Sequence, residues 1–208
     1  MCFYTQQNAT KKEVQSRFDA EIDNEETYLE NDFINGFSYP NMPIILNTKP
    51  ELITTNYSWG LLPSWAKDED FRKNTLNARI ETVDEKASFK NVMQNRCLVI
   101  ATAYYEWRWN DEKGKSKDKY QINSQEDEIF TFAGLYSKWV NPATGEEKNT
   151  YTILTTEANE LMQYVHNHKK RMPVVLHKKD EKAWLDNSNA IRDFAFPYQA
   201  SIVAFQTN

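Results

Sequence analysis

The sequence predicts an α+β fold that is dominated by mixed or antiparallel sheet. Its 208 residues are typical of one domain, and we expect a single domain over residues 1–208. Short segments rich in aromatic and β-branched residues recur along the chain, separated by Pro, Gly and polar residues. This is the pattern of short strands joined by turns. Aromatic residues make up 13% of the chain, which supplies apolar surface for a substantial core.

The expected helices are short and lie between strands. In the first of them, Val14 and Phe18 have an i, i+4 spacing, which gives one apolar face. In the helix expected over residues 157–166, Thr156 is the expected N-cap. Glu157 lies in its first turn, where a negative charge interacts favourably with the helix dipole. We expect roughly three to five short helices, including residues 11–20, 87–94, 157–166 and 180–185.

The longest strand signal is the segment RCLVIATAYYEWRW, residues 96–109. Its first half is apolar on both faces and therefore predicts a central strand. A polar loop around Gly114 follows it and predicts a hairpin. We expect roughly six to eight strands in all, the others over residues 43–46, 51–59, 119–123, 129–140, 149–156 and 198–205.

The chain carries 25 Lys and Arg against 30 Asp and Glu, a formal net charge of −5. Such a chain does not attract phosphate through its overall field, so a nucleic-acid site must be local and must use stacking surfaces. There is no apolar run of about 20 residues and no apolar segment near the start. We therefore expect no membrane, no secretory signal, and a cytoplasmic setting in which Cys2 and Cys97 are free thiols.

Cys2 is the most informative position, because removal of the initiator Met1 gives it a free α-amine beside its thiol. With ordinary pKa values of about 8 and about 8.5, both groups have a reactive fraction at neutral pH. The amine can form a Schiff base with an aldehyde, and the thiol can then close a thiazolidine ring. The same pair can attack an amide as an N-terminal nucleophile. Taken alone, however, Cys2 is more often a small buried residue.

A carboxylate among aromatic residues stands near the end of the segment 96–109. Strand alternation places Glu106 on one face with Tyr104 and Arg108, and the other face carries Tyr105, Trp107 and Trp109. Partial desolvation would raise the pKa of Glu106 toward the range useful for proton transfer. A salt bridge from Glu106 to Arg108 or to another basic group is the alternative.

In the segment NARIET, Asn77 and Arg79 are two residues apart and point the same way in an extended chain. Arginine can bind phosphate through two hydrogen bonds, and asparagine can orient a polar intermediate. The alternative is a turn asparagine beside a surface arginine.

His166 and His168 follow the third expected helix and precede a basic run that ends at Arg171. A helix C-terminus favours protonated histidine, which would be an acid near neutral pH. The basic run would suit a phosphate. Alternatively, the histidines only cap the last helical carbonyls.

In the segment WGLLPSW we expect Trp59 in the core and Trp65 exposed as a stacking surface for unpaired bases.

The usual cofactor and metal motifs are missing from the sequence. It contains no P-loop and no GxGxxG, CxxC, HExxH or GxSxG segment. Three His and two distant Cys do not form a zinc pattern. We therefore expect neither a metal nor a cofactor.

Five segments together resemble one family. In order, they are Cys2 behind Met1, WGLLPSW, NARIET, RCLVIATAYYEW and HNHKKRMPVVL, and the resemblance extends from Cys2 to the segment DEKAWL. The sequence resembles the SRAP family, the SOS response-associated peptidases or abasic-site processing proteins, which are YedK-like in bacteria and HMCES-like in animals. The resemblance implies one SRAP-like domain with a mixed or antiparallel, barrel-like β core and short peripheral helices.

The resemblance also implies a function. Met1 is removed, by autopeptidase action or by an aminopeptidase, and Cys2 then forms a reversible thiazolidine crosslink with an abasic site in single-stranded DNA. This shields the lesion during the DNA damage response, and lyase activity is also implied. The partner is single-stranded DNA, and the protein is expected to be a monomer. By match to the family, the catalytic residues are Cys2, Asn77, Glu106 and His166, and the DNA contacts are Arg79, Arg171, Trp65 and Pro40.

Two departures from the family pattern matter. Many members begin CGR, whereas Tyr4 stands here in place of that arginine, so one DNA contact is missing or Tyr4 stacks instead. Many members read HxRMP, with one residue between His and Arg, whereas four residues separate His166 from Arg171 here, so His166 and His168 compete for one role. We prefer His166 because it follows the aliphatic Val165. The alternatives are a peptidase or amidase that uses Cys2 on protein substrates, and a non-covalent single-strand binder.

Overall fold

The centre of the molecule is a closed barrel of five strands, seen in a computed structural model that describes residues 2–207. The strands lie in the order β11, β10, β7, β4 and β5, and β5 returns to β11 through a parallel pairing of Ser58 with Thr150 and Trp59 with Tyr151. The expected α+β fold with a mixed, barrel-like β core is therefore confirmed. The barrel strands are β4 (Asn41–Leu46), β5 (Lys49–Trp59), β7 (Arg96–Ala101), β10 (Phe130–Val140) and β11 (Glu147–Glu157).

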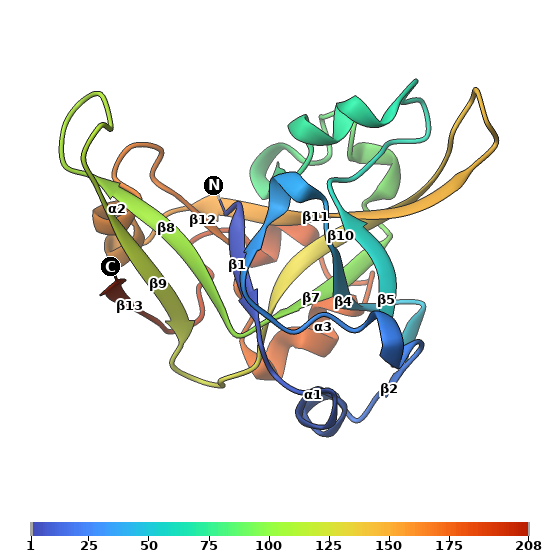
Figure 1. Ribbon diagram of the computed structural model, residues 1–208, viewed down its shortest axis with the longest axis horizontal. Helices are drawn as coiled ribbons and strands as arrows, with labels where there is room; N and C mark the ends of the chain where they lie inside the picture. Colours follow the sequence, from blue (N-terminus) through green and yellow to red (C-terminus); the bar gives the residue numbers. More distant parts are fainter. Residues whose placement is uncertain (1, 208) are drawn as a thin grey trace.

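A second, antiparallel sheet lies beside the barrel, in the order β13, β9, β8, β1 and β3 (Figure 1). β1 lies between β8 and β3, with Tyr4 opposite Tyr105 on one side and Asn35 on the other. The beginning of the chain is thus held inside a sheet. These strands are β1 (Tyr4–Gln7), β3 (Asn31–Asn35), β8 (Ala103–Trp109), β9 (Lys117–Ser124) and β13 (Ile202–Thr207).

Short elements surround the two sheets. No helix within residues 2–207 is both long and apolar enough to cross a bilayer. The remaining strands are β2 (Glu21–Ile22), β6 (Asn77–Arg79) and β12 (Arg171–Pro173), and the α-helices are α1 (Lys11–Phe18), α2 (Glu160–Val165) and α3 (Glu181–Leu185). Short 3-10 turns are η1 (Glu25–Thr27), η2 (Gly36–Ser38), η3 (Glu69–Asn74), η4 (Ile80–Thr82), η5 (Lys90–Val92), η6 (Lys178–Asp180) and η7 (Ile191–Phe194).

Trp59 is part of the core, as expected. Its side chain is fully buried, and its indole Nε1 donates to the carbonyl of Leu76 at 2.7 Å. A buried indole needs such an acceptor, because an unsatisfied N–H in the core is costly. Tyr151, on the barrel strand that pairs with β5, stacks at 6.2 Å from Trp59. The barrel seam between β5 and β11 is therefore also packed by side chains.

The segment expected as one long strand is two strands. β7 ends at Ala101 in the barrel, and β8 begins at Ala103 in the other sheet. Thr102 between them donates its N–H to Gln6 and accepts from Asn123 Nδ2 through its carbonyl. Its backbone groups are thus satisfied by the second sheet, which lets the chain change sheets without burying unsatisfied polar groups.

Two helix expectations need correction. Residues 87–94 form turns and the short element η5, because their hydrogen bonds mostly span three residues, as in Val92 to Phe89. The N-cap of α2 is Asn159, which accepts from the N–H of Met162 at 2.9 Å, and not Thr156. Thr156 and Glu157 instead end β11. The helix α1 is confirmed, with Val14 buried.

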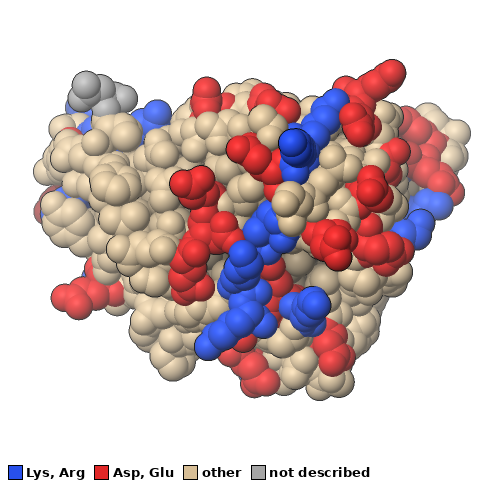
Figure 2. Space-filling model, turned by 90° about the horizontal axis from the view of Figure 1, so that it is seen from below, with Lys and Arg blue, Asp and Glu red and all other residues tan. Residues whose placement is uncertain are grey.

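Charged side chains of both signs share the face shown in Figure 2. Lys and Arg form a band across this face, and Asp and Glu lie along both sides of it. Because opposite charges lie close together, much of their field cancels beyond a Debye length of about 10 Å. This face therefore carries no broad surface of one sign.

Candidate active site

Cys2 lies in the core beside the first strand of the second sheet. Its side chain has no exposed area, and it belongs to the buried cluster that includes Tyr104 and Met162. Burial raises the pKa of the Cys2 thiol well above its usual value, and the nearby charge of Glu106 raises it further. In the chain as described the thiol is therefore protonated at neutral pH. The reactive thiolate fraction stays a prediction for the form that has lost Met1.

Asn77 holds the backbone of Cys2. It begins β6, which pairs with β11 of the barrel, and its side-chain Nδ2 donates to the carbonyl of Cys2 at 2.9 Å. Its Oδ1 is buried and has no hydrogen-bond partner among residues 2–207. An acceptor beside Cys2 is thus left open, and a new N–H donor at this position would satisfy it. Arg79, two residues along the same strand, is exposed.

Glu106 approaches Cys2 from β8. The side chain is 5% exposed, and burial raises the pKa of its carboxyl to about 7. A carboxyl with this pKa can both accept and release a proton near neutral pH. Arg108 does not pair with it, because the Arg108 guanidinium lies 3.9 Å from the ring centroid of Tyr164 and donates to the Tyr164 carbonyl. The alternative of a salt bridge to Arg108 is therefore excluded.

His166 faces Glu106 from the end of α2. Its Nε2 lies 3.7 Å from Oε2 of Glu106, and its Nδ1 lies 2.8 Å from the carbonyl of Arg171. Since a carbonyl only accepts, Nδ1 carries the proton and the neutral ring presents a lone pair on Nε2 toward the carboxyl. Burial lowers the pKa of His166 to about 4. The expectation of a protonated histidine is therefore wrong, and the pair is suited to a proton held on the Glu106 side.

The two histidines occupy different environments. His168 is exposed and stacks on Trp109, with ring centroids 3.7 Å apart and an angle of 6° between the planes. His166 is 7% exposed and lies beside Glu106. The preference for His166 as the partner of Cys2 and Glu106 agrees with this placement.

Arg171 is brought to a carboxylate and not to an open groove. Its Nη1 and Nη2 donate to Glu81 at 2.9 and 2.8 Å, and Nη2 also donates to the carbonyl of Thr155 at 2.8 Å. The side chain is largely buried. A paired guanidinium of this kind mainly fixes local structure, and the carbonyl of the same residue holds His166.

Trp65 and Pro40 lie apart from these groups. Trp65 is 49% exposed, as expected, and its Nε1 donates to the carbonyl of Ala87 at 3.2 Å. Pro40 is half-buried, and its carbonyl accepts from the N–H of Trp59 at 2.9 Å. The structure thus gathers Cys2, Asn77, Glu106 and His166. Of these four, only Glu106 and His166 line the cavity described next, and Arg79, Trp65 and Pro40 do not line it.

A cavity of about 370 Å³ opens beside the Glu106–His166 pair. Lys117 and Lys169 bring positive charge to its wall, together with the exposed ring of His168. The sequence indicated Lys169 as part of the basic run after His166 that would suit a phosphate, but it did not single out Lys117. The lining residues are Phe3, Tyr4, Glu106, Trp107, Trp109, Lys117, His166, His168 and Lys169.

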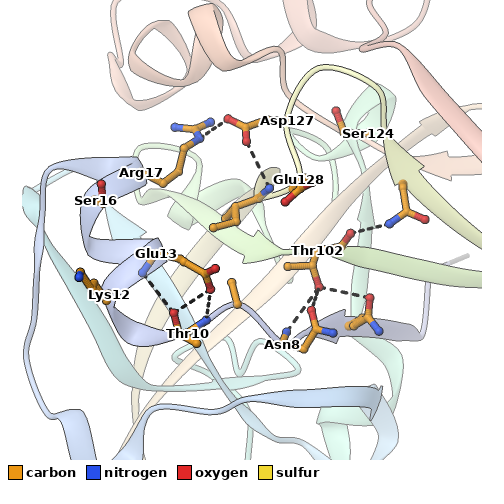
Figure 3. Close-up of a pocket in the computed structure, with 14 residues that line it drawn as sticks. Asn8, Thr10, Lys12, Glu13, Ser16, Arg17, Thr102, Ser124, Asp127 and Glu128 are labelled. Carbon is orange, nitrogen blue, oxygen red and sulfur yellow. Dashed lines mark hydrogen bonds and ion pairs between the residues drawn. The ribbon is translucent and has the colours of Figure 1, made fainter.

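A larger hollow of about 1070 Å³ lies between α1 and the start of β10, near the far end of β1 (Figure 3). Its polar side chains mostly bond to one another. Thr10 and Glu13 form the capping box of α1, Arg17 pairs with Asp127, and Thr102 donates to Asn8. Because it does not reach Cys2 or Glu106, this hollow is not part of the candidate site.

Among residues 2–207, no three His, Cys, Asp or Glu side chains are grouped as a metal site needs.

The fold and the gathered side chains define a class of α+β barrel proteins that bury a cysteine at position 2 beside a glutamate and a histidine. The family described as SOS response associated peptidase (SRAP) matches residues 1–206. The chain belongs to this family.

Relatives of known name support the same assignment. "Abasic site processing protein YoqW" of Bacillus subtilis (strain 168) is 44% identical over 137 residues, which cover 65% of this chain and 58% of that protein. "Abasic site processing protein HMCES" of Gallus gallus is 31% identical over 176 residues, 69% of this chain and 51% of that protein. The chain therefore spans little more than half the length of these curated relatives.

Solved structures resemble the whole chain. A protein from Bacteroides thetaiotaomicron has a TM-score of 0.89 and 33% identity, and the match covers 100% of this chain and 92% of that one. A protein from Bordetella bronchiseptica has a TM-score of 0.80 and 25% identity, with both chains fully covered.

Proposed function

We propose that this protein captures abasic sites in single-stranded DNA through a covalent, reversible bond to Cys2 after removal of Met1. The observation that carries the proposal is the convergence of Cys2, Asn77, Glu106 and His166 from four separate parts of the chain. Relatives named as abasic site processing proteins support the choice of substrate.

The proposed chemistry uses both groups of one residue. Hydrolysis of the bond between Met1 and Cys2 consumes one water and releases an α-amine. The amine nitrogen attacks the aldehyde carbon of the ring-opened sugar, and loss of water gives an imine. The thiol sulfur then bonds to the imine carbon while its proton moves to the nitrogen. The product is a five-membered thiazolidine, and the same steps in reverse release the DNA.

The neighbours of Cys2 have distinct proposed roles. Glu106, with a pKa of about 7, accepts the thiol proton and returns it to nitrogen or water. Neutral His166 accepts a proton at Nε2 as the sugar ring opens, because its Nδ1 is held by the Arg171 carbonyl. Asn77 orients the reacting nitrogen, since its Oδ1 is the open acceptor beside Cys2.

The path of the DNA is proposed from fewer contacts. Arg79 and Trp65 are exposed and suit a phosphate and an unpaired base. Pro40 is placed with them by family resemblance. A phosphate at Arg171 would have to compete with Glu81, so we assign Arg171 mainly to positioning His166.

Further parts of the proposal concern the whole protein. It acts as one SRAP domain and a monomer, in the cytoplasm and on the nucleoid, during the DNA damage response. Removal of Met1 is proposed as an autopeptidase step, in which the Glu106–His166 pair activates water. Lyase activity at the captured sugar would use the same imine.

One gel experiment tests the proposal. The purified protein is mixed with a single-stranded oligonucleotide that contains one abasic site, and the mixture is run under denaturing conditions. We expect a band of protein bound to DNA that is lost in Cys2→Ala and when an alkoxyamine blocks the aldehyde. Turnover of an amide substrate without this band would favour the peptidase alternative. A native shift that Cys2→Ala leaves unchanged, again without the band, would favour a non-covalent binder.

Intact mass is the necessary companion measurement. A protein that has lost Met1 should crosslink, and a protein that retains it should not, because only the former has the free amine. A crosslink formed by protein that retains Met1 would contradict the proposed chemistry.

A further inference from the structure

A row of aromatic side chains on the second sheet takes no part in the proposed chemistry. Tyr105, Trp107 and Trp109 alternate along β8, so their side chains follow one face of the strand. At ~3.3 Å per residue, the row from Tyr105 to Trp109 is about 13 Å long. Trp107 and Trp109 are half-buried and Tyr105 is buried.

Two neighbouring strands extend the row into a surface. Tyr4 of β1 is directly opposite Tyr105 and therefore lies on the same face. Phe33 of β3 packs on Tyr4, with centroids 5.1 Å apart and planes at 23°, and on Tyr105 at 5.1 Å. Trp107 meets Tyr4 edge-on at 4.9 Å. We call the four residues Tyr4, Phe33, Tyr105 and Trp107 the aromatic platform. The ring of Trp109 at its end is already stacked on His168 and is not counted with them.

Lysines from the next strand border the aromatic platform. In β9, Lys119 is the partner of Trp107 and Lys117 is the partner of Trp109. The Lys119 Nζ lies 4.8 Å from the ring centroid of Phe33, and the Lys117 Nζ lies 4.9 Å from that of Trp109. Cations beside aromatic faces are the combination that binds single strands, because bases stack on the rings and phosphates lie near the cations.

The aromatic platform is continuous with the candidate site. Tyr4, Trp107 and Trp109 line the 370 Å³ cavity that also contains Glu106. Phe33 is 41% exposed, which is unusual for a phenylalanine that only stabilises a core. A single-stranded DNA whose lesion enters this cavity would therefore contact the aromatic platform with its neighbouring nucleotides.

We propose that the aromatic platform stacks the bases of the nucleotides on one side of the lesion, with Lys117 and Lys119 near their phosphates. This inference rests on the proposed function and adds a second binding surface to it. Because every base has a π face, the surface accepts any sequence.

The test separates bases from phosphates. The probe is a fluorescent single-stranded oligonucleotide with a central tetrahydrofuran, an abasic analogue that has no aldehyde and cannot crosslink. In two further oligonucleotides, the bases of either the 5′ or the 3′ flank are replaced by the same analogue, so that the phosphates remain. We expect one of these replacements to weaken binding by wild-type protein about tenfold.

The variants show whether the aromatic platform is responsible. Phe33→Leu and Trp107→Leu should lose most of the tenfold preference for the intact flank, because leucine keeps apolar volume but offers no ring. Phe33→Tyr should retain it. Tyr57→Leu is the matched control, since Tyr57 is a half-buried aromatic that packs edge-on against Tyr136 in the barrel. Thermal unfolding confirms that each variant is folded.

Lys119 gives an independent measurement. Lys119→Ala should reduce the slope of log K against log salt by about 0.7, the value for one contact with a single-stranded phosphate. An unchanged slope would remove Lys119 from the proposal.

The inference and the proposed function fail in different ways. If neither flank needs its bases, or if Phe33→Leu and Trp107→Leu keep the wild-type preference, the aromatic platform does not bind bases. In that case wild-type protein still crosslinks to an aldehyde-bearing oligonucleotide. If the platform variants behave as expected but no crosslink forms with the aldehyde, the covalent function fails and single-strand binding stands.

Discussion

Replacement of Glu106 by Gln should stabilise the protein at high pH. Burial raises the pKa of this carboxyl from 4.5 to about 7, and one pKa unit corresponds to about 1.36 kcal/mol. Holding the ionised carboxylate in the folded chain therefore costs about 3 kcal/mol above pH 7. Glutamine has nearly the same shape and cannot ionise, so Glu106→Gln removes this cost.

The sign of the effect sets the pH window. Between pH 4.5 and 7 the folded chain binds more protons at Glu106 than the unfolded chain, so the stability of the wild type falls as pH rises through this range. The free energy of unfolding of Glu106→Gln should equal that of the wild type near pH 4.5. It should exceed the wild-type value by about 3 kcal/mol at pH 8.

Urea unfolding at a series of pH values measures this difference. Titrations of groups far from Glu106 are common to both proteins and cancel in the comparison, whereas that of His166 does not, because its Nε2 lies 3.7 Å from the Glu106 carboxyl. Intact mass is checked first, because a new ammonium group at Cys2 would favour the ionised carboxyl and reduce the effect. A stability difference that does not change between pH 4.5 and 8 would show that the Glu106 carboxyl is not desolvated, and the proton-transfer role would lose its basis.

Three more predictions concern the site and its supports. His166→Ala should slow crosslink formation in a timed gel assay while His168→Ala should not, because only His166 faces Glu106; equal rates for both variants would contradict this. Asn159→Ala should lower the free energy of unfolding by about 1 kcal/mol through loss of the α2 cap. Urea unfolding measures this, and an unchanged free energy would show that Asn159 does not stabilise α2 as a cap. Trp59→Ala should cost about 3–5 kcal/mol, and a loss below 1 kcal/mol would mean that the barrel seam does not depend on it.

Local patterns were sufficient for the regular elements. The strands β10 and β11 are indicated by their β-branched and aromatic residues, and α1 is indicated by the i, i+4 spacing of Val14 and Phe18. The closure of the barrel was not visible in the residues themselves, because the parallel pairing of β5 with β11 joins positions about ninety residues apart. It was expected only through resemblance to the family.

The N-cap of α2 shows why local signals were ambiguous. Thr156 and Asn159 are both good capping residues. The structure uses Thr156 elsewhere, since its hydroxyl donates to Glu81 at 3.1 Å and accepts from the N–H of Phe196 at 2.8 Å. Contacts from distant segments therefore decided the position of the helix start.

The sequence singled out the residues that the structure gathers around Cys2, but it did not indicate their protonation states. A sequence places His166 at a helix end, which favours the protonated form. It does not contain the burial that lowers the pKa of His166 to about 4. In the same way, the sequence indicated a cation at Arg171 but not its pairing with Glu81, although Glu81 belongs to the same NARIET segment as Asn77.

The first strand has a consequence for ligand capture. β1 is hydrogen-bonded on both sides, and the carbonyl of Phe3 accepts from Gly36 at 2.8 Å. A freely moving terminus would lose about 1–2 kcal/mol of backbone entropy per residue when it docks on a ligand. Here that ordering is completed during folding, so under the proposed function the backbone of Cys2 is already fixed before the sugar arrives, although its side chain has no exposed area in the chain as described. Loosening the pairing of β1 should therefore weaken capture even when every reactive group is intact.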